Sequence, residues 1–182
     1  VIAQDQDQRL PVARGESRRR RHRRVEAAQG AAHPCAVVGV GGGVDLFVLD
    51  EQDRMRANAA QMRAPDSANP YLQVGYDSAV DGAPAPPARM CRTGAACDSA
   101  QLATFDVHEL QRELHASFPR GRVLVCRDAV VWDAARGRLS WDCTGGPADP
   151  PVIKLGWTYA GDTGDAGAAP MVAIAVPAAG LP

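Results

Sequence analysis

The sequence is poor in aromatic residues and in lysine, and it has no long apolar run. Phe, Trp and Tyr make up 5% of the 182 residues, so a core has to rely on Val, Leu and a few aromatic positions. Lys154 is the only lysine among 20 basic residues. No stretch of about 20 apolar residues occurs, which excludes a membrane-spanning helix in the sequence as given. A secretory signal pattern is not visible either. The formal net charge of −1 gives no reason to expect nucleic acid as a partner.

Motifs for catalysis, cofactors and metals are also missing. No Gly-x-Ser-x-Gly segment presents a nucleophile. The glycines at positions 39–43 resemble the start of a dinucleotide fingerprint, but Val44 stands where the third glycine is needed. His108 and His115 are separated by about 10 Å of helical rise, too far to share one metal ion, and we predict that both lie on the surface. We therefore expect no enzyme activity, cofactor or metal.

Five cysteines are present, and four of them form two plausible pairs. Cys91 and Cys97 have five residues between them, which is not zinc-ligand spacing. Cys126 and Cys143 end two predicted strands on either side of a hairpin. The pattern favours two disulfides, Cys91–Cys97 and Cys126–Cys143, over a zinc half-site, and it leaves Cys35 over. Two disulfides indicate an oxidising compartment, in contrast to the missing signal.

The first 46 residues differ from the rest of the chain. "QDQDQ" and "SRRRRHRR" are typical of disorder, and the arginine run has no interleaved aromatics that would favour a nucleic-acid patch over a solvated tail. "CAVVGVGGGV" looks like a strand that runs into glycines. We therefore divide the chain into an atypical basic and Gly-rich part, 1–46, predicted to be disordered, and a globular part, 47–182.

Two helices are expected in the globular part. The first covers 45–63, and residues 64–90 after it form a loop rich in Pro, Gly and Asp. The second begins at Asp98 or Ser99, with Gln101 in capping-box spacing, and ends at Pro119. Its buried stripe consists of Ala103, Val107, Leu110, Leu114 and Phe118. Asp106, Glu109 and Glu113 lie away from this stripe, where carboxylates are expected to be solvated.

The period of the pattern changes to two after residue 120. "RVLVCR", "AVVWD", "RLSWDC", "VIKLGWTYA" and "MVAIAV" are short β-rich runs between turn residues. A Gly-containing loop at 134–137 joins two of them as a hairpin. The sequence therefore predicts an α+β fold in which a helix packs on an antiparallel sheet of about four strands.

Several of these segments, in this order, resemble the type IV pilus modification protein family, the minor pilins of the PilV type. The resemblance covers about residues 47–160 and starts with "DRMRAN", in which the family motif corresponds to Asp53, Arg54, Met55, Arg56 and Asn58. The Cys91–Cys97 pair follows. Asp106 then matches the family's Asp in the second helix, although Leu110 stands where members usually carry Trp.

The resemblance implies a type IV pilin-like fold and a non-enzymatic minor pilin-like subunit in pilus assembly or modification. It implies other minor pilins and pilus assembly proteins as partners, and an inner-membrane, periplasmic or pilus location. Family members start with a processing site and a long apolar helix, and residues 1–46 contain neither, so that helix is truncated or replaced here. Membrane contact is therefore expected only if the native protein has this helix.

An Arg-, Ala- and Gly-rich stretch is typical of GC-rich DNA translated out of frame, so we expect a frame disruption upstream of about residue 47. The alternative function is a small secreted, disulfide-containing binding or adhesion module with a basic tail.

Overall fold

Three helices, two 3-10 turns and six strands make up the described part of the chain. The computed structural model describes residues 42–92, 96–158 and 169–177, and the side chains from residue 47 onward. All of them belong to one compact unit, residues 34–182. The helices are α1 (Gly42–Ala57), α2 (Ala59–Met62) and α3 (Ser99–Ser117), and the 3-10 turns are η1 (Asp66–Ala68) and η2 (Pro70–Gln73). The strands are β1 (Gly75–Asp77), β2 (Arg122–Arg127), β3 (Trp132–Asp133), β4 (Arg138–Leu139), β5 (Pro151–Gly156) and β6 (Val172–Ala175).

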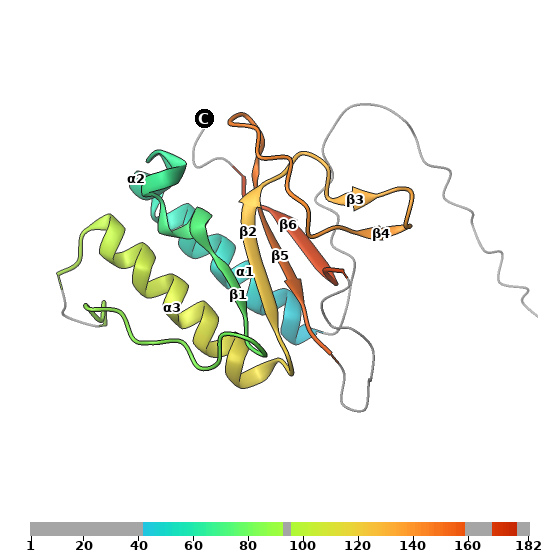
Figure 1. Cartoon of the computed structure of the whole chain (residues 1–182). Helices are drawn as coiled ribbons and strands as arrows, with labels where there is room; N and C mark the ends of the chain where they lie inside the picture. The colour runs from blue at the N-terminus through green and yellow to red at the C-terminus, as the bar shows by residue number, and fades with distance from the viewer. Residues whose placement is uncertain (1–41, 93–95, 159–168, 178–182) are drawn as a thin grey trace, which may run out of the picture. The chain divides into compact units, whose positions relative to one another are not determined.

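Four strands form one antiparallel sheet in the order β1-β2-β5-β6, and β3 pairs with β4 in a separate hairpin. Helices α1 and α3 cover one face of the sheet, whereas the hairpin lies beyond the other (Figure 1). The predicted α+β class is confirmed. None of the described helices combines the length and the apolar character that crossing a membrane requires.

The first helix begins at Gly42, three residues before the expected start at Asp45. Phe47, Val48 and Met55 of this helix are buried in the core. The helix is interrupted at Asn58, and α2 continues for one turn. The prediction of a strand that runs into the glycines is wrong at its end, since Gly42 and Gly43 are helical. The earlier part of the predicted strand lies outside the described residues.

The second helix begins as predicted. The Asp98 carboxylate accepts a hydrogen bond from the backbone N–H of Gln101 at 2.8 Å, and the Gln101 side chain accepts one from the Asp98 N–H at 3.3 Å, which completes the capping box. Leu110 and Leu114 are buried in the core as expected.

The predicted polar side of α3 is partly wrong. Asp106 and His108 are 6% and 8% exposed, so they are neither solvated nor on the surface. Asp106 is covered by α1 and η2, which contact it through Arg54 and Tyr71. The connection that follows β1 also runs back alongside α3 (Figure 1). Arg92 at the end of this connection lies 3.6 Å from Glu109. An apolar stripe identifies only one of the two packed sides.

The expected loop at 64–90 is also wrong in part, because its first half contributes to the core. Tyr71, Val74 and Tyr76 are buried, and β1 pairs with β2 at the edge of the sheet. Arg127 of β2 fixes this segment by binding both carboxylate oxygens of Asp66, at 2.6 and 2.7 Å. These elements are only three or four residues long, too short to produce a periodic pattern.

An aromatic cluster holds α1 at its N-terminal half. The ring centroids of Phe47 and Phe118 are 5.0 Å apart, and those of Phe118 and Trp157 are 5.5 Å apart. The three rings come from α1, from the residue after α3, and from the residue after β5. Such tilted and edge-to-face pairs add to the free energy gained from burial.

The opposite face of the sheet carries a buried ion pair. The Lys154 ammonium lies 2.6 Å from Oδ2 of Asp128, and both side chains are 0% exposed. Lys154 also donates to the carbonyl oxygens of Ser140 and Asp142, at 2.8 and 2.5 Å. Two hydrogen-bond acceptors and one counter-ion therefore surround the ammonium.

The segment between β2 and β5 is held on the sheet by this ion pair and by two further contacts. The predicted hairpin within this segment is present as β3 and β4, but its strands are shorter than expected. The Cys126–Cys143 disulfide closes the segment, and Arg122 stacks on Trp141 at 4.3 Å. Trp141 also packs so closely on Gly156 that a Cβ there would lie 3.0 Å from the indole.

Replacing Lys154 by Met should destabilise the protein by about 3–5 kcal/mol, because Asp128 then remains buried without a counter-ion. Urea denaturation measures this loss. The double variant Lys154→Met, Asp128→Asn removes the orphaned charge and should recover at least half of the stability. A double variant that is less stable than Lys154→Met alone would show that the two residues do not act as a pair.

Candidate functional site: a buried polar seam between two helices

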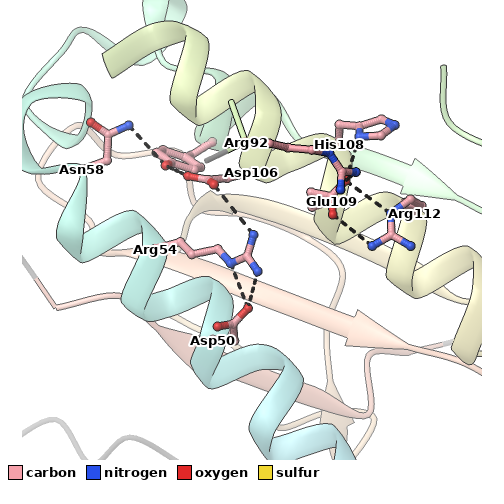
Figure 2. A network of polar contacts seen from close by, with 9 residues as sticks. Asp50, Arg54, Asn58, Arg92, Asp106, His108, Glu109 and Arg112 are labelled. Carbon is pink, nitrogen blue, oxygen red and sulfur yellow. Dashed lines mark hydrogen bonds and ion pairs between the residues drawn. The ribbon is translucent and has the colours of Figure 1, made fainter. Parts of the chain in front are cut away.

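The residues that carry the "DRMRAN" resemblance divide into two groups on α1. Arg54 and Asn58 are one turn apart and point towards α3 (Figure 2). Met55 is fully buried in the core. Asp53 and Arg56 lie on the exposed side, where they form an ion pair of 3.4 Å with each other. The structure thus brings Arg54 and Asn58 together with Asp106, but not Asp53 or Arg56.

Asp50, Arg54, Asn58, Tyr71 and Asp106 form a polar seam between α1 and α3. Asp106 of α3 is its centre. Its Oδ2 accepts a hydrogen bond of 2.5 Å from the hydroxyl of Tyr71, which is itself buried in η2. Its Oδ1 lies 3.8 Å from Nη1 of Arg54. Because the carboxylate is 6% exposed, these two groups replace nearly all of the water that it would otherwise bind.

Asn58 positions the tyrosine. Its side-chain amide donates to the carbonyl oxygen of Ser99 at 2.7 Å and to the hydroxyl of Tyr71 at 3.3 Å. Ser99 is the first residue of α3, so one side chain connects the end of α1 with the start of α3 and with η2. The buried amide satisfies both of its donors in this way.

Arg54 connects the interior of the seam with its rim. Its Nε donates to Oδ2 of Asp50 at 2.8 Å, and Nη2 lies at the same distance from that oxygen. The guanidinium therefore has an exposed carboxylate on one side and a buried one on the other (Figure 2). It neutralises charge across the boundary between core and solvent.

Burial controls the electrostatics of the seam. It raises the pKa of Asp106, and the hydrogen bond from Tyr71 and the charge of Arg54 counteract this shift. Burial and the bond to Asp106 raise the pKa of Tyr71. A tyrosine that is harder to ionise remains a hydrogen-bond donor, so the pair is suited to holding α1, η2 and α3 together.

A second group of charges lies further along α3. Glu109 accepts a bond of 2.9 Å from Arg112, which lowers the pKa of Glu109, and it is approached by His108 at 3.4 Å and Arg92 at 3.6 Å (Figure 2). Arg92 is adjacent to Cys91. The group therefore attaches the disulfide-bearing segment to the helix.

Both expected disulfides are present. Cys91 pairs with Cys97 across a Cα–Cα distance of 6.0 Å, and Cys126 pairs with Cys143 across 6.3 Å. The alternative of a zinc half-site is thereby excluded for these four residues, and the described residues contain no group of three or more ligands that could hold a metal. The two bridges point to an oxidising compartment outside the cytoplasm. Cys35 lies outside the described residues.

Several residues of these sites were missed in the sequence. Tyr71 belongs to a segment predicted to be a loop, and Lys154 to a strand whose hydrophobic neighbours gave no sign of a partner. Lys154 did have one signal, since it is the only lysine of the chain. Glu51, which is buried on α1, had no such signal in the sequence.

Comparison of the chain with protein-family models, with curated proteins and with solved structures found no match. The geometry of the seam and the sequence resemblance are therefore the basis for function.

Replacing Tyr71 by Phe should destabilise the protein by about 1.5–3 kcal/mol, the usual range for a hydrogen bond to a charged group. The matched control is Tyr76→Phe, because the Tyr76 hydroxyl donates to the neutral carbonyl oxygen of Gly82. That variant should lose only about 0.5–1.5 kcal/mol in the same urea experiment. Equal losses for the two variants would contradict the central role of Asp106.

Proposed function

We propose that this protein is a minor pilin-like, non-enzymatic subunit that takes part in the assembly or modification of a type IV pilus. The observation that carries the proposal is the meeting of two distant parts of the resemblance. Arg54 and Asn58 of "DRMRAN" and Asp106 of the second helix lie in one buried seam. Because these residues share a structural role in the fold, there is a physical reason why they occur together in one sequence pattern.

The position of α1 supports the same function. In the family that the sequence resembles, a long apolar helix enters the globular domain and continues into the "DRMRAN" segment. Here α1 packs on the sheet through Phe47, Val48 and Met55, and the aromatic cluster and the seam hold its two halves. A helix that entered along α1 would thus be attached firmly to the globular part.

The two disulfides agree with the oxidising compartment in which a pilus subunit functions. A pilus subunit is exposed to the periplasm or the exterior, where disulfides persist. We place the protein in the inner membrane and periplasm or in the pilus, with other minor pilins and pilus assembly proteins as partners, and without a role in nucleic-acid binding.

The gene provides a direct test. Upstream of the Asp45 codon, an alternative reading frame should encode an apolar run of about 20 residues, the length that a membrane-spanning helix requires. Basic residues should precede it, and a glutamate should lie near its start, as the resemblance implies. DNA sequencing through this region checks the expectation. Three frames without such a run would favour the alternative, a secreted binding or adhesion module.

A protein-level test uses a chimera in which a pilin-type apolar helix is joined to residue 42. We expect the chimera to co-purify with minor pilins from detergent-solubilised membranes of a piliated bacterium. The control joins the same helix to an unrelated disulfide-containing domain and should not co-purify. If both chimeras are recovered equally, the helix alone is responsible, and the globular part is not a pilin-type partner.

A further inference from the structure

Glu51 is a buried carboxyl group on the helix that carries Arg54 and Asn58. It lies on α1 and is 3% exposed. Within the described part of the chain, its side chain makes no hydrogen bond or ion pair. Every other carboxyl group of the seam has a partner, since Asp50 binds Arg54 and Asp106 binds Tyr71. An ionised carboxylate in this position would lose its hydration without compensation.

The groups around Glu51 make its ionisation more difficult still. Glu51 lies about one turn before Arg54 on α1, on the side of the helix that carries the seam. The charges of Asp106 and Asp50 raise its pKa, and that of Arg54 lowers it. The charge of Glu51 in turn contributes to the raised pKa of Tyr71 in η2. Three carboxyl groups therefore share one guanidinium. Arg54 is already bound to Asp50 at 2.8 Å and lies 3.8 Å from Asp106, so it cannot also balance a full charge on Glu51.

We propose that Glu51 is a proton-controlled latch on the seam between α1 and α3, closed when its carboxyl is protonated and loosened when the carboxyl ionises. The charge of Asp106 then repels that of Glu51 across the two helices. The latch acts within the globular part and goes beyond the proposed function, since it applies equally to a pilus subunit and to a secreted module.

The direction of the pH dependence follows from the burial of Glu51. Desolvation, followed by the charge of Asp106, raises the pKa of Glu51 from 4.5 to about 8. Between these two values the folded protein binds more protons than the unfolded chain. Stability is therefore highest below pH 4.5 as far as this group is concerned, and it falls as the pH rises towards about 8. An extracytoplasmic protein experiences such changes directly, because the pH around it is not buffered by the cell.

Thermal unfolding of the full chain and of Glu51→Gln, compared at several pH values from 5 to 9, tests the latch. The glutamine has the same shape and cannot ionise. We expect the parent to lose stability across this range and the variant to lose much less, so that at pH 9 the variant melts about 5 °C or more above the parent. Titration of all groups other than Glu51 is common to both proteins and cancels in the difference.

Asp53→Asn is the matched control, because it removes an exposed carboxylate of the same helix that pairs with Arg56 outside the seam. Its melting temperature should change with pH as that of the parent does. Hydrogen exchange of the α1 amides in the parent is the second measurement, and it should accelerate between pH 6 and pH 9 beyond the intrinsic effect of pH. Parallel pH profiles for the parent and Glu51→Gln, or α1 exchange that shows only the intrinsic effect, would overturn the proposal.

Discussion

The burial of the Asp106 carboxylate between α1 and α3 is the constraint on which the helical half of the structure depends. A carboxylate that is 6% exposed is tolerated only if other groups replace its water. Tyr71 and Arg54 supply that replacement, and Asn58 holds Tyr71 in place. These requirements determine where neighbouring elements lie. They draw η2 into the core and fix the end of α1 next to the start of α3.

The other face of the sheet repeats the arrangement with the opposite charge at its centre. Lys154 is fully buried in β5 and gathers Asp128 and two backbone carbonyl oxygens around its ammonium. The sequence has few aromatic residues with which to build a thick core on this side. This ammonium with its counter-ion and two acceptors, together with the Cys126–Cys143 bridge, holds the hairpin segment where apolar area alone offers little. Both faces therefore owe their specificity to polar groups that have one satisfactory arrangement.

The predictable parts of this fold are the long periodic ones. The cap at Asp98 and the stripe through Leu110 and Leu114 identified α3, and alternation identified β2, β5 and β6. Cysteine spacing predicted both disulfides. Tyr71 and β1 escaped because they belong to elements of three or four residues, in which tertiary contacts outweigh local preference. Asp106 and His108 were placed in solvent because a helical pattern does not reveal a second packed side. The resemblance indicated Arg54, Asn58 and Asp106 of the seam, but physical chemistry alone did not indicate that they meet.

The seam also limits the ways in which it can serve a function. Arg54 is partly buried, and Asn58, Tyr71 and Asp106 are nearly inaccessible, so these side chains contribute little to contact with a partner. What they determine is the orientation of α1 relative to α3 and the sheet. A binding module that acts through its surface has no special need for a fixed orientation of its first helix. A subunit attached to an assembly through that helix does, because any change in angle is transmitted to the rest of the domain. Glu51 lies on the same helix, on the side that carries the seam, so the latch proposed above acts on this same orientation.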